Sequence, residues 1–371
     1  MRIVHISSVH PPGDPRICYK ECRSVARAGH EVHLVMAGAE SLILEGVTIH
    51  SVARPRSRFD RVLRTVPGVL SVAKKLNPDW VHLHDPELMV GIPYLRAAGI
   101  RVVYDMHEDL PAQLRQKHWI PAVVRPLAAG IARTVERLLL PRCSVVYAEK
   151  SYGESRPWVT DSVEVLNFPI LEDVRNIVAQ ARPAGLPWIG YIGSITRERG
   201  AFVMLQAAAE LRRRGVEVGC LLIGGGPPRT MADLRDMAEK LELRHVEFPG
   251  YLAPADGLGM IAGCEVGAAL LQPLPNYMDS YPTKLFEYMA LGIPSVVSDF
   301  PLYRSIVERS GSGALVDPTD PVSVADAIAS LLADPRISAE MGAAGRAAAL
   351  ESYSWESQVP QLLSLYVALG R

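Results

Sequence analysis

The sequence predicts an α/β protein built from two doubly wound parallel-sheet domains. Short apolar segments of strand length alternate with helical stretches through the first half, and the same pattern starts again in the second half. Such alternation is typical of parallel sheets that are covered by helices on both faces. The length of 371 residues and the 49% of hydrophobic residues suit two domains, each with a sizeable core.

In the first half, turn and helix signals bound each expected strand. A helix is expected from about 16 to 28, with Gly29 as the residue that ends it. The expected strands are RIVHISS (2–8), EVHLVMA (31–37), DWVHLHD (79–85) and RVVYDMHE (101–108).

The second half repeats this order after a stretch that has prolines and no apolar period. That stretch, about 168–185, is the expected linker between a first domain, 1–167, and a second domain, 186–355. Ligands of doubly wound sheets bind beyond the carboxyl ends of the strands, so the cleft between two such domains is the expected site. The expected strands are WIGYIGS (188–194), VGCLLIGGG (218–226), HVEFPGY (245–251), CEVGAALLQ (264–272) and IPSVVSD (293–299).

Composition argues against several classes of protein. The five cysteines are odd in number and scattered, which predicts reduced thiols and no disulfide framework. The pI of about 6.8 and the lack of a binding motif argue against a nucleic-acid partner. The first residues, MRIVHISS, read as a strand and not as a signal peptide, and no apolar run reaches about 18 residues. We therefore expect a cytoplasmic protein.

The net charge of −1 conceals an asymmetry, because residues 1–165 carry +5 and the remainder carries −6. Two basic segments of the first half, 54–75 and 112–142, also contain apolar residues, and the second includes Lys117 and Trp119. Segments of this kind can lie on an anionic membrane surface, attract a polyanionic acceptor, or form solvated faces. Peripheral contact with the inner face of a membrane is one of the partners expected on this ground.

The stretch DSYPTKLFEYMALGIPSVVSD (279–299) places two charges in an apolar helix. Thr283 is the expected N-cap, so the amides of the first turn, up to Phe286, would form an anion site next to Lys284. Glu287 lies one turn further along, roughly 5 Å away, which resembles the step from a diphosphate to a ribose. A solvated pair between Lys284 and Glu287 is the other interpretation, and the spacing alone leaves both open.

The same stretch resembles the signature of glycosyltransferase family 4. The resemblance consists of a loop acid, Asp279, then Glu287 eight residues later, then MALGIPSVV; the family usually has Glu at the first position. It implies the GT-B fold, in which two Rossmann-like domains face an interdomain cleft and a terminal helix, here about 356–371, crosses back to the N-terminal domain. It also implies a retaining enzyme that uses a nucleotide sugar, with Lys284, Thr283 and Leu285 near the diphosphate.

Three further segments of the second half match the family. YIGSITRERG resembles its first strand and loop, in which Gly193 and Ser194 stand where the family has Gly-Arg. Arg199 then replaces the lysine that grips the diphosphate, and Arg197 is the candidate for the lost charge. The glycines of LLIGGGPP, Gly225 among them, would make room for the nucleotide, and Leu252 after HVEFPGY would contact the base.

In the first half, the resemblance implies that His107 lies beside the donor sugar, together with Asp279. The first loop, SSVHPPGDPR, has one glycine where the family commonly has several. Gly13, Asp14 and Arg16 are its candidates for contact with the acceptor or the phosphates. A structural, proline-rich turn is the alternative interpretation of this loop.

The expected reaction moves a sugar from a nucleoside-diphosphate sugar, with UDP the commoner base in the family, to a hydroxyl of a glycan or lipid-linked glycan. A small natural product is the alternative acceptor. The resemblance implies a reaction without a metal or other cofactor, in which Arg199, His107 and Asp279 act on the donor. Two other classes stay open, an epimerase or hydrolase of nucleotide sugars on the same fold and a non-catalytic binder.

A metal-dependent hydrolase is the rival that the residues themselves suggest. His82 and His84 share one face of a strand, and neutral imidazole is a common metal ligand. The remaining ligands would be Asp85, Glu87 and His107. A His-x-His pair is weak evidence, and the second half offers no clear partner ligands.

Overall fold

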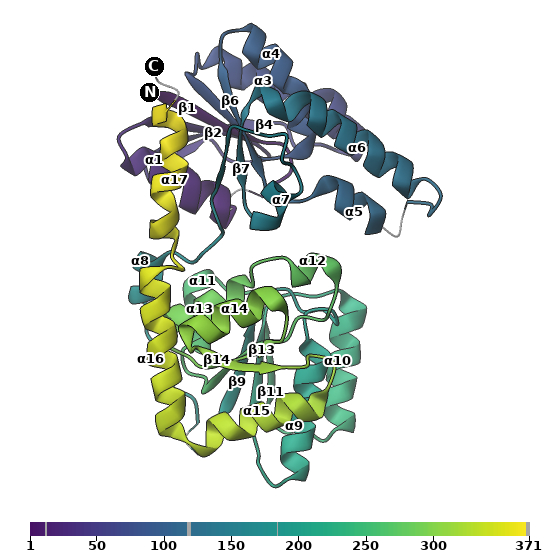
Figure 1. The fold of residues 1–371 in the computed structure, drawn as a ribbon, viewed down its shortest axis with the longest axis vertical. Coiled ribbons are helices and arrows are strands. Elements are labelled where there is room, and N and C mark those ends of the chain that lie inside the picture. Colours follow the sequence, from purple (N-terminus) through teal and green to yellow (C-terminus); the bar gives the residue numbers. More distant parts are fainter. Residues whose placement is uncertain (12, 117–119, 184, 369–371) are drawn as a thin grey trace. The chain divides into compact units, whose positions relative to one another are not determined.

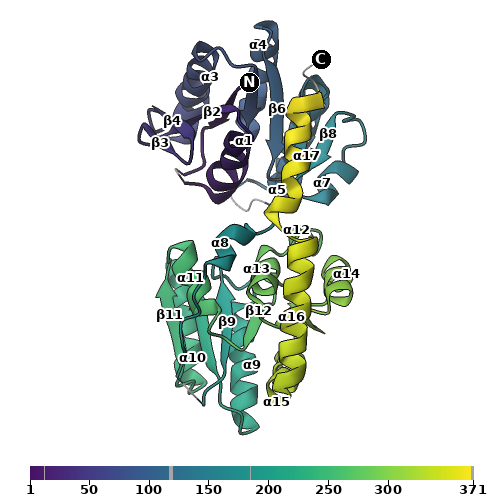
Figure 2. The same ribbon diagram turned by 90° about the vertical axis from the view of Figure 1, so that its left-hand side faces the viewer.

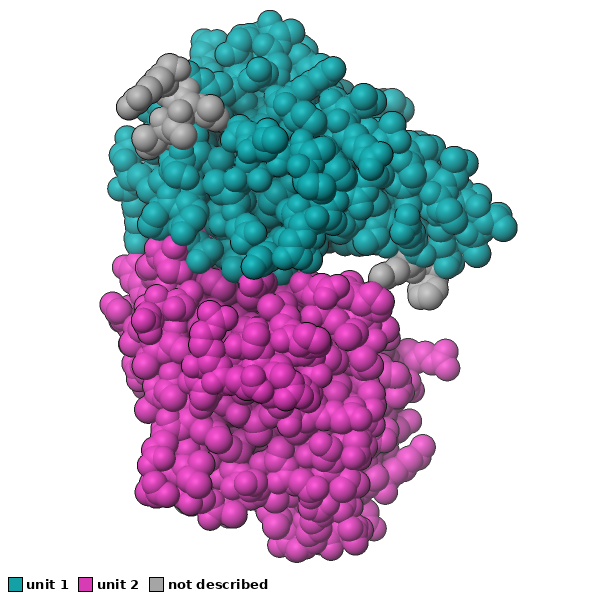
Figure 3. Space-filling model, viewed as in Figure 1, with its two compact units in different colours: residues 1–167, 358–371 teal, residues 168–357 magenta. Residues whose placement is uncertain are grey.

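The computed structural model describes residues 1–11, 13–116, 120–183 and 185–368. The chain divides into two compact units, 1–167 with 358–371 and 168–357 (Figure 3). The segment 168–185, expected as a linker, falls in the second unit. There α8 (Leu171–Arg175) begins with the amides of Leu171 and Glu172, which donate to Glu356 at 3.2 and 3.1 Å.

The first unit contains an eight-stranded sheet in the order β3-β4-β2-β1-β5-β6-β7-β8, parallel apart from the β3–β4 pair. Its strands are β1 (Arg2–Ser7), β2 (Glu31–Ala37), β3 (Leu42–Leu44), β4 (Val47–Val52), β5 (Trp80–Leu83), β6 (Arg101–Met106), β7 (Ser144–Tyr147) and β8 (Ser162–Glu164). Its helices are a π-helical segment η1 (Pro15–Cys22), α1 (Arg23–Arg27), α2 (Arg58–Asp60), η2 (Arg61–Thr65), α3 (Val66–Lys75), η3 (Pro86–Gly91), α4 (Ile92–Ala97), α5 (Leu110–Gln116), α6 (Arg125–Leu139), η4 (Leu140–Arg142), α7 (Lys150–Glu154) and most of α17 (Trp355–Ala368).

The two faces of this sheet differ in chemistry. One face carries an apolar core formed with α3, η3 and α4, to which β5 contributes Val81 and Leu83. Side chains alternate along a strand, so Trp80 and His82 point to the other face. That face meets α17, where the ring of Tyr366 packs edge-on against Trp80 at 5.6 Å (Figure 2).

The second unit contains a six-stranded parallel sheet in the order β11-β10-β9-β12-β13-β14. Helices α9, α10 and α15 cover one face, and α11, α13, α14 and α16 cover the other (Figures 1 and 2). The strands are β9 (Trp188–Ile192), β10 (Gly219–Ile223), β11 (Val246–Gly250), β12 (Val266–Ala269), β13 (Ser295–Ser298) and β14 (Gly313–Val316). The helices besides α8 are α9 (Ala201–Arg213), α10 (Pro228–Lys240), α11 (Pro254–Ile261), α12 (Pro275–Met278), α13 (Thr283–Leu291), α14 (Pro301–Ser310), α15 (Pro321–Ala333) and α16 (Pro335–Glu351).

All nine strands expected from the sequence are present, and the two doubly wound sheets are confirmed. The sequence missed the strands β3, β4, β7, β8 and β14. The helix expected from 16 to 28 is instead the π-helical segment η1 followed by α1, which ends at Arg27, and Gly29 has the left-handed φ of 86° that suits the end of a helix. The five cysteines are free and buried. None of the described helices combines the length and the apolarity that crossing a membrane requires.

Candidate functional site

The strand order of the second unit itself indicates where a ligand binds. The chain runs outward from β9 to β10 and β11, then returns to β12 on the other side of β9. Ligands of such sheets bind at this reversal, beyond the carboxyl ends of the two central strands. The segments that follow β9 and β12, 193–200 and 270–282, therefore frame the candidate site, and α13 follows directly.

Glycines allow the loops at this edge to approach each other closely. The amide of Gly193 donates to Ile223 O at 2.9 Å, and Ile195 donates to Gly225 O at 2.8 Å. A Cβ on Gly224 would lie 2.0 Å from Gly193 O, and one on Gly200, whose φ is 87°, would lie 2.1 Å from Leu270 O. These glycines thus allow the loop after β9 to lie directly against the loops that follow β10 and β12.

Lys284 and Arg199, which we call the cation pair, meet at Tyr191 of β9. The Lys284 ammonium lies 4.4 Å from the centre of the Tyr191 ring, and Lys284 is only 7% exposed. Burial and then the charge of Arg199 lower the pKa of Lys284 to about 7, against an opposing effect of Glu287. Burial raises the pKa of Tyr191, and Arg199 opposes that shift through its charge and a hydrogen bond. Lys284 over the Tyr191 ring and Arg199 hydrogen-bonded to the same tyrosine bring two cations together, which makes a strong site for an anion.

The N-terminus of α13 lies next to this pair. The helix begins at Thr283, whereas the sequence predicted Thr283 as the N-cap. Pro282 is the cap residue; its carbonyl accepts from the Leu285 amide at 2.8 Å, and its ring offers no acceptor for the amides of Thr283 and Lys284. Those amides and the positive end of the helix dipole favour an anion. The apolar face expected for this helix is confirmed, because Leu285, Phe286, Met289 and Ala290 are all buried.

The other residues predicted for this unit lie on the surrounding loops. Asp279 is exposed at the end of α12, and Arg199 lies 5.8 Å from the ring of Tyr277 on the same helix. Ser194 is exposed, and its carbonyl accepts from the Tyr191 hydroxyl at 2.5 Å. Leu252 is half-buried after β11. Arg197 stacks on the ring of Phe202 of α9 at 3.7 Å, a position the sequence did not indicate.

In the first unit, His107 follows β6 and contacts two buried groups. Its Nε2 lies 3.1 Å from Asp105 Oδ2 and 3.2 Å from His84 Nδ1. Although burial raises the pKa of Asp105, the charges of Arg16 and His107 hold it well below its usual range. Asp105 therefore stays an anion that orients His107.

The first loop differs from its prediction at one of its three candidate residues. Gly13 has a φ of 82°, and Asp14 accepts from the amides of Arg16 and Ile17 and faces His10 Nδ1 at 3.0 Å. Arg16, expected at the tip of the loop, is only 5% exposed. Its guanidinium donates to Asp105 at 3.0 and 3.2 Å and to Val165 O at 2.9 Å, and it pairs with Glu21 at 3.0 Å. The carboxylates of Asp105 and Glu21 are both buried, and buried carboxylates require a cation.

The residues of the rival metal set are divided between different partners. Asp85 accepts from the Ser7 hydroxyl and from Ser8, and Glu87 pairs with Arg61 at 2.8 Å. His82 and His84 do share one face of β5 and its extension, as predicted. Of the other predicted ligands, His107 does lie beside His84, together with Asp105. His82 and His84 also lie with His5 and Glu21, two residues that the sequence analysis did not connect with them.

The basic segments expose apolar side chains. Phe59 and Leu63 are 82% and 73% exposed in the segment 54–75, and Leu127 and Ile131 are 66% and 58% exposed on α6. Arginines accompany both pairs in the sequence. Lys117 and Trp119 lie outside the described residues.

Comparisons with known proteins cover both units. The family model described as Glycosyltransferase Family 4 matches residues 15–152, and that described as Glycosyl transferases group 1 matches residues 175–348. Over 200 residues, 51% of this chain and 45% of the relative, the chain is 33% identical to the D-inositol 3-phosphate glycosyltransferase of Corynebacterium urealyticum. Over 189 residues, 48% and 47% of the two chains, it is 30% identical to the GDP-mannose-dependent alpha-(1-6)-phosphatidylinositol monomannoside mannosyltransferase of Mycolicibacterium smegmatis.

These matches span about half the length of the two relatives. A solved structure, Alr3699/HepE from Anabaena in complex with UDP, superposes with a TM-score of 0.75 over 100% of both chains at 16% sequence identity. That likeness concerns the fold.

Proposed function

This chain belongs to glycosyltransferase family 4 and has the GT-B fold, and on that premise we propose that it is a retaining glycosyltransferase. It moves a sugar from a nucleoside-diphosphate sugar to a hydroxyl group of a glycan or lipid-linked glycan. The observation that carries the proposal is the cation pair at the N-terminus of α13, beside the reversal of strand order.

Each part of the donor has a candidate partner in the second unit. The cation pair and the first-turn amides of α13 bind the diphosphate, and Glu287, one turn along the helix, accepts from the ribose hydroxyls. Glu287 is close enough to raise the pKa of Lys284, as a neighbouring anion does. Leu252 and Gly225 border the nucleotide, and Asp279 contacts the sugar. For His107 of the first unit, a role toward the sugar is supported by the family resemblance.

The chemistry that these groups supply is stabilisation of the leaving diphosphate. As the glycosidic bond to the diphosphate breaks, negative charge grows on its oxygens, and the cation pair is placed where that charge develops. The acceptor hydroxyl attacks from the face that the diphosphate leaves, and a diphosphate oxygen takes its proton. Asp105 fixes the orientation of His107, whose ring can then donate to a sugar hydroxyl. No step requires a metal in this scheme.

We propose UDP as the base and a cell-surface or lipid-linked glycan as the acceptor. UDP is supported by the family resemblance and by the HepE structure, which holds it. GDP is the competing base, because one relative is a GDP-mannose-dependent enzyme. A small natural product remains the second acceptor class.

A thermal-shift panel of UDP, GDP, ADP and TDP, with their common sugars, tests the donor site. A ligand at 100 times its Kd stabilises a protein by about 2.7 kcal/mol, which such a panel detects. Glu287→Gln should lose most of the shift given by the preferred nucleotide. Glu340→Gln on α16, which removes an exposed carboxylate 2.7 Å from Arg336, should keep it. A wild type that no nucleotide stabilises would contradict the proposal.

Release of nucleoside diphosphate, followed by chromatography, separates transfer from the two related activities. A transferase releases it at full rate only with an acceptor, whereas a hydrolase or epimerase needs none. The anomeric configuration of the product, read by NMR, tests retention.

The exposed apolar residues of the basic segments are the proposed contact with an anionic membrane. Arg58, Arg61 and Arg64 flank Phe59 and Leu63 in the sequence, a combination that favours anionic lipid surfaces. Flotation with phosphatidylglycerol vesicles should recover the wild type and lose Leu63→Ser. Val178→Ser, at an 81% exposed site of the second unit, is the control that should still float. Equal recovery with phosphatidylcholine vesicles would contradict an electrostatic contact.

A further inference from the structure

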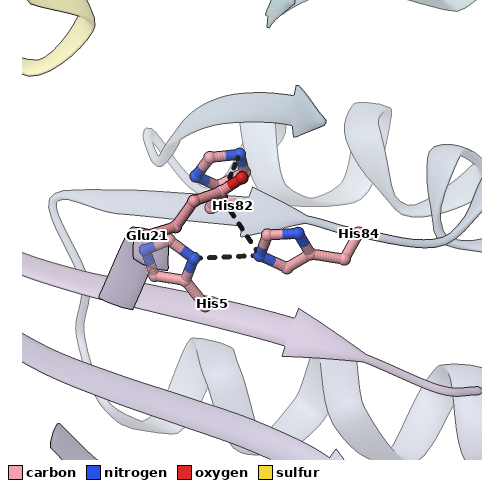
Figure 4. Close-up of side chains that lie close together, drawn as sticks. All are labelled: His5, Glu21, His82 and His84. Carbon is pink, nitrogen blue, oxygen red and sulfur yellow. Dashed lines mark hydrogen bonds and ion pairs between the residues drawn. The ribbon is translucent and has the colours of Figure 1, made fainter. Parts of the chain in front are cut away.

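The face of the first sheet that meets η1 and α17 buries a group of polar side chains. His5 of β1 is the register partner of His82 of β5, and His84 follows two residues later on the same face. Glu21 of η1 reaches this face from above the sheet (Figure 4). These four residues, which we call the His–Glu cluster, are 0% or 1% exposed.

The donor atoms of the His–Glu cluster converge at distances that suit one metal ion. His5 Nδ1 lies 2.9 Å from His84 Nε2, and Glu21 Oε2 lies 3.8 Å from His82 Nε2 and 4.0 Å from His84 Nε2 (Figure 4). Four ligands at about 2.0–2.1 Å around a tetrahedral ion lie about 3.3–3.4 Å apart. The separations in the cluster fall on both sides of that value, so small side-chain rotations bring all four atoms to one centre.

Several of these atoms have no hydrogen-bond partner within the described part of the chain. They include both carboxylate oxygens of Glu21 and Nε2 of His82. Arg16 Nε lies 3.0 Å from Glu21 Oε1 as an ion-pair partner. A fully buried carboxylate that faces two imidazole nitrogens at 3.8–4.0 Å is too far away to hydrogen-bond them, and a bound cation would satisfy all three.

The charges around the His–Glu cluster also leave room for a cation. Arg16 is shared between Glu21 and the buried Asp105. Burial and then the charge of Asp105 raise the pKa of Glu21 well above its usual value, so a metal ion bound here would displace a proton from this carboxyl group. Burial lowers the pKa values of His5 and His82 well below the usual range and that of His84 to about 4, so the imidazoles are neutral. Neutral imidazole is the form that binds metals.

Two neighbouring groups fix the ring orientations that ligation needs. His84 Nδ1 lies 3.4 Å from Asp105 Oδ2, and His82 Nδ1 lies 2.8 Å from the Tyr366 hydroxyl on α17. His82 and His84 thus each have a partner on the far side of the ring, which directs Nε2 toward the centre, whereas His5 faces the centre with Nδ1. Metal-bound histidines almost always have such a partner for their second nitrogen.

We propose that the His–Glu cluster binds one divalent transition-metal ion, with three imidazoles and one carboxylate as in many Zn²⁺ sites. The ion joins β1, β5 and η1 beneath the loop edge that carries His107, and it stabilises the first unit without taking part in glycosyl transfer. The proposal does not depend on the proposed function, because nucleotide binding involves the other unit. In a metal-free cluster, Glu21 would carry a proton, and a second proton would lie in the hydrogen bond between His5 and His84.

Elemental analysis of the full chain, purified without a polyhistidine tag and dialysed against a chelator, tests the site. One equivalent of zinc per chain is expected, and protein produced in cobalt-supplemented medium should show the visible spectrum of tetrahedral Co²⁺. Glu21→Gln and His82→Gln should lose the metal and the spectrum. Zinc well below one equivalent per chain that Glu21→Gln retains equally, with no cobalt spectrum, would overturn the proposal in favour of the protonated cluster.

The chain offers a matched control in a second histidine pair. His33 Nδ1 lies 3.0 Å from His50 Nε2 on β2 and β4, with Glu31 beside them, yet Glu31 is exposed. His50→Gln should leave the metal content unchanged, and metal lost from this variant instead would place the ion elsewhere. If the cluster variants do not fold, the cobalt spectrum of the wild type decides, since an octahedral spectrum or none contradicts the site.

Discussion

The Lys284 ammonium lies over the face of the Tyr191 ring, 4.4 Å from its centre, in a part of the second unit that excludes most water. Cation–π attraction supplies about 2 kcal/mol or more when the cation is desolvated, which offsets part of the hydration that the ammonium loses. With Arg199 close by, the folded protein holds two like charges together in the absence of an anion. This arrangement has energetic consequences that can be measured.

Removing the buried ammonium should stabilise the protein while it abolishes nucleotide binding. For Lys284→Met we expect the free energy of unfolding at pH 7 to rise by several kcal/mol, since the fold disfavours the charged form by about 1.4 kcal/mol for each unit by which it lowers the pKa of Lys284. The destabilising effect of Lys284 is full below pH 7 and fades as pH rises toward 10.5, where the unfolded chain also loses this proton. Urea denaturation measures it, with the exposed Lys240→Met as a neutral control.

Nucleotide binding should take up a proton above pH 7. The diphosphate favours the ammonium form of Lys284, whose pKa in the free protein is about 7, so affinity should fall by up to about tenfold per pH unit as pH rises from 7. Titration calorimetry in two buffers with different ionisation enthalpies counts the proton. Lys284→Arg, which stays charged, should bind with little pH dependence. An affinity of the wild type that is constant from pH 7 to 9 would refute this role.

Gly200→Ala should destabilise the second unit through two separate effects. The left-handed backbone disfavours alanine by about 1–2 kcal/mol, and the new Cβ would lie 2.1 Å from Leu270 O. Gly215→Ala has the same kind of φ, 83°, but meets nothing within 4 Å. The difference between the two variants in urea denaturation isolates the clash, and equal losses would show that the loops after β9 and β12 can separate without a penalty.

Tyr366→Phe should destabilise the first unit by about 1–3 kcal/mol, because it leaves buried His82 Nδ1 without its 2.8 Å partner. Tyr147→Phe is the matched change. The Tyr147 hydroxyl is buried and has no hydrogen-bond partner among the residues that the structure describes, so its loss should be neutral or stabilising. Thermal denaturation of both variants is the measurement, and similar losses would argue against a specific Tyr366–His82 bond.

The helix α13 and its buried face could be predicted from the sequence because the signals there are local. The apolar period of α13 and the spacing from Lys284 to Glu287 lie within nine residues, and both follow directly from helix geometry. Tyr191 was missed because its role depends on a contact with Lys284, which lies far from it in the chain, and no local pattern encodes such a contact. The N-cap was misassigned at Thr283 because the proline before it occupies the cap position.

Prediction was weaker where the structure depends on pairing across the chain. The strands β8 and β14 have three and four residues, too short for a clear period, and β3 is an exposed edge strand. Arg16 reads as a loop cation, since only the fold brings Asp105, 89 residues away, to its guanidinium. The His–Glu cluster escaped notice for the same reason: its members come from three elements, and only the register of β1 with β5 aligns His5 with His82.

Because most of α17 belongs to the first unit, a single cut in the gene cannot separate the two units. Residues 358–371 belong to the same unit as 1–167, although 190 residues of the other unit separate them in the chain. A fragment that stops at residue 167 would contain every strand of the first sheet but would lack Tyr366. Trp80 and His82, which Tyr366 contacts, would then be exposed. During synthesis this unit therefore closes only after α17 has been made, and a version of it without the second unit requires α17 to be fused back, for example by circular permutation.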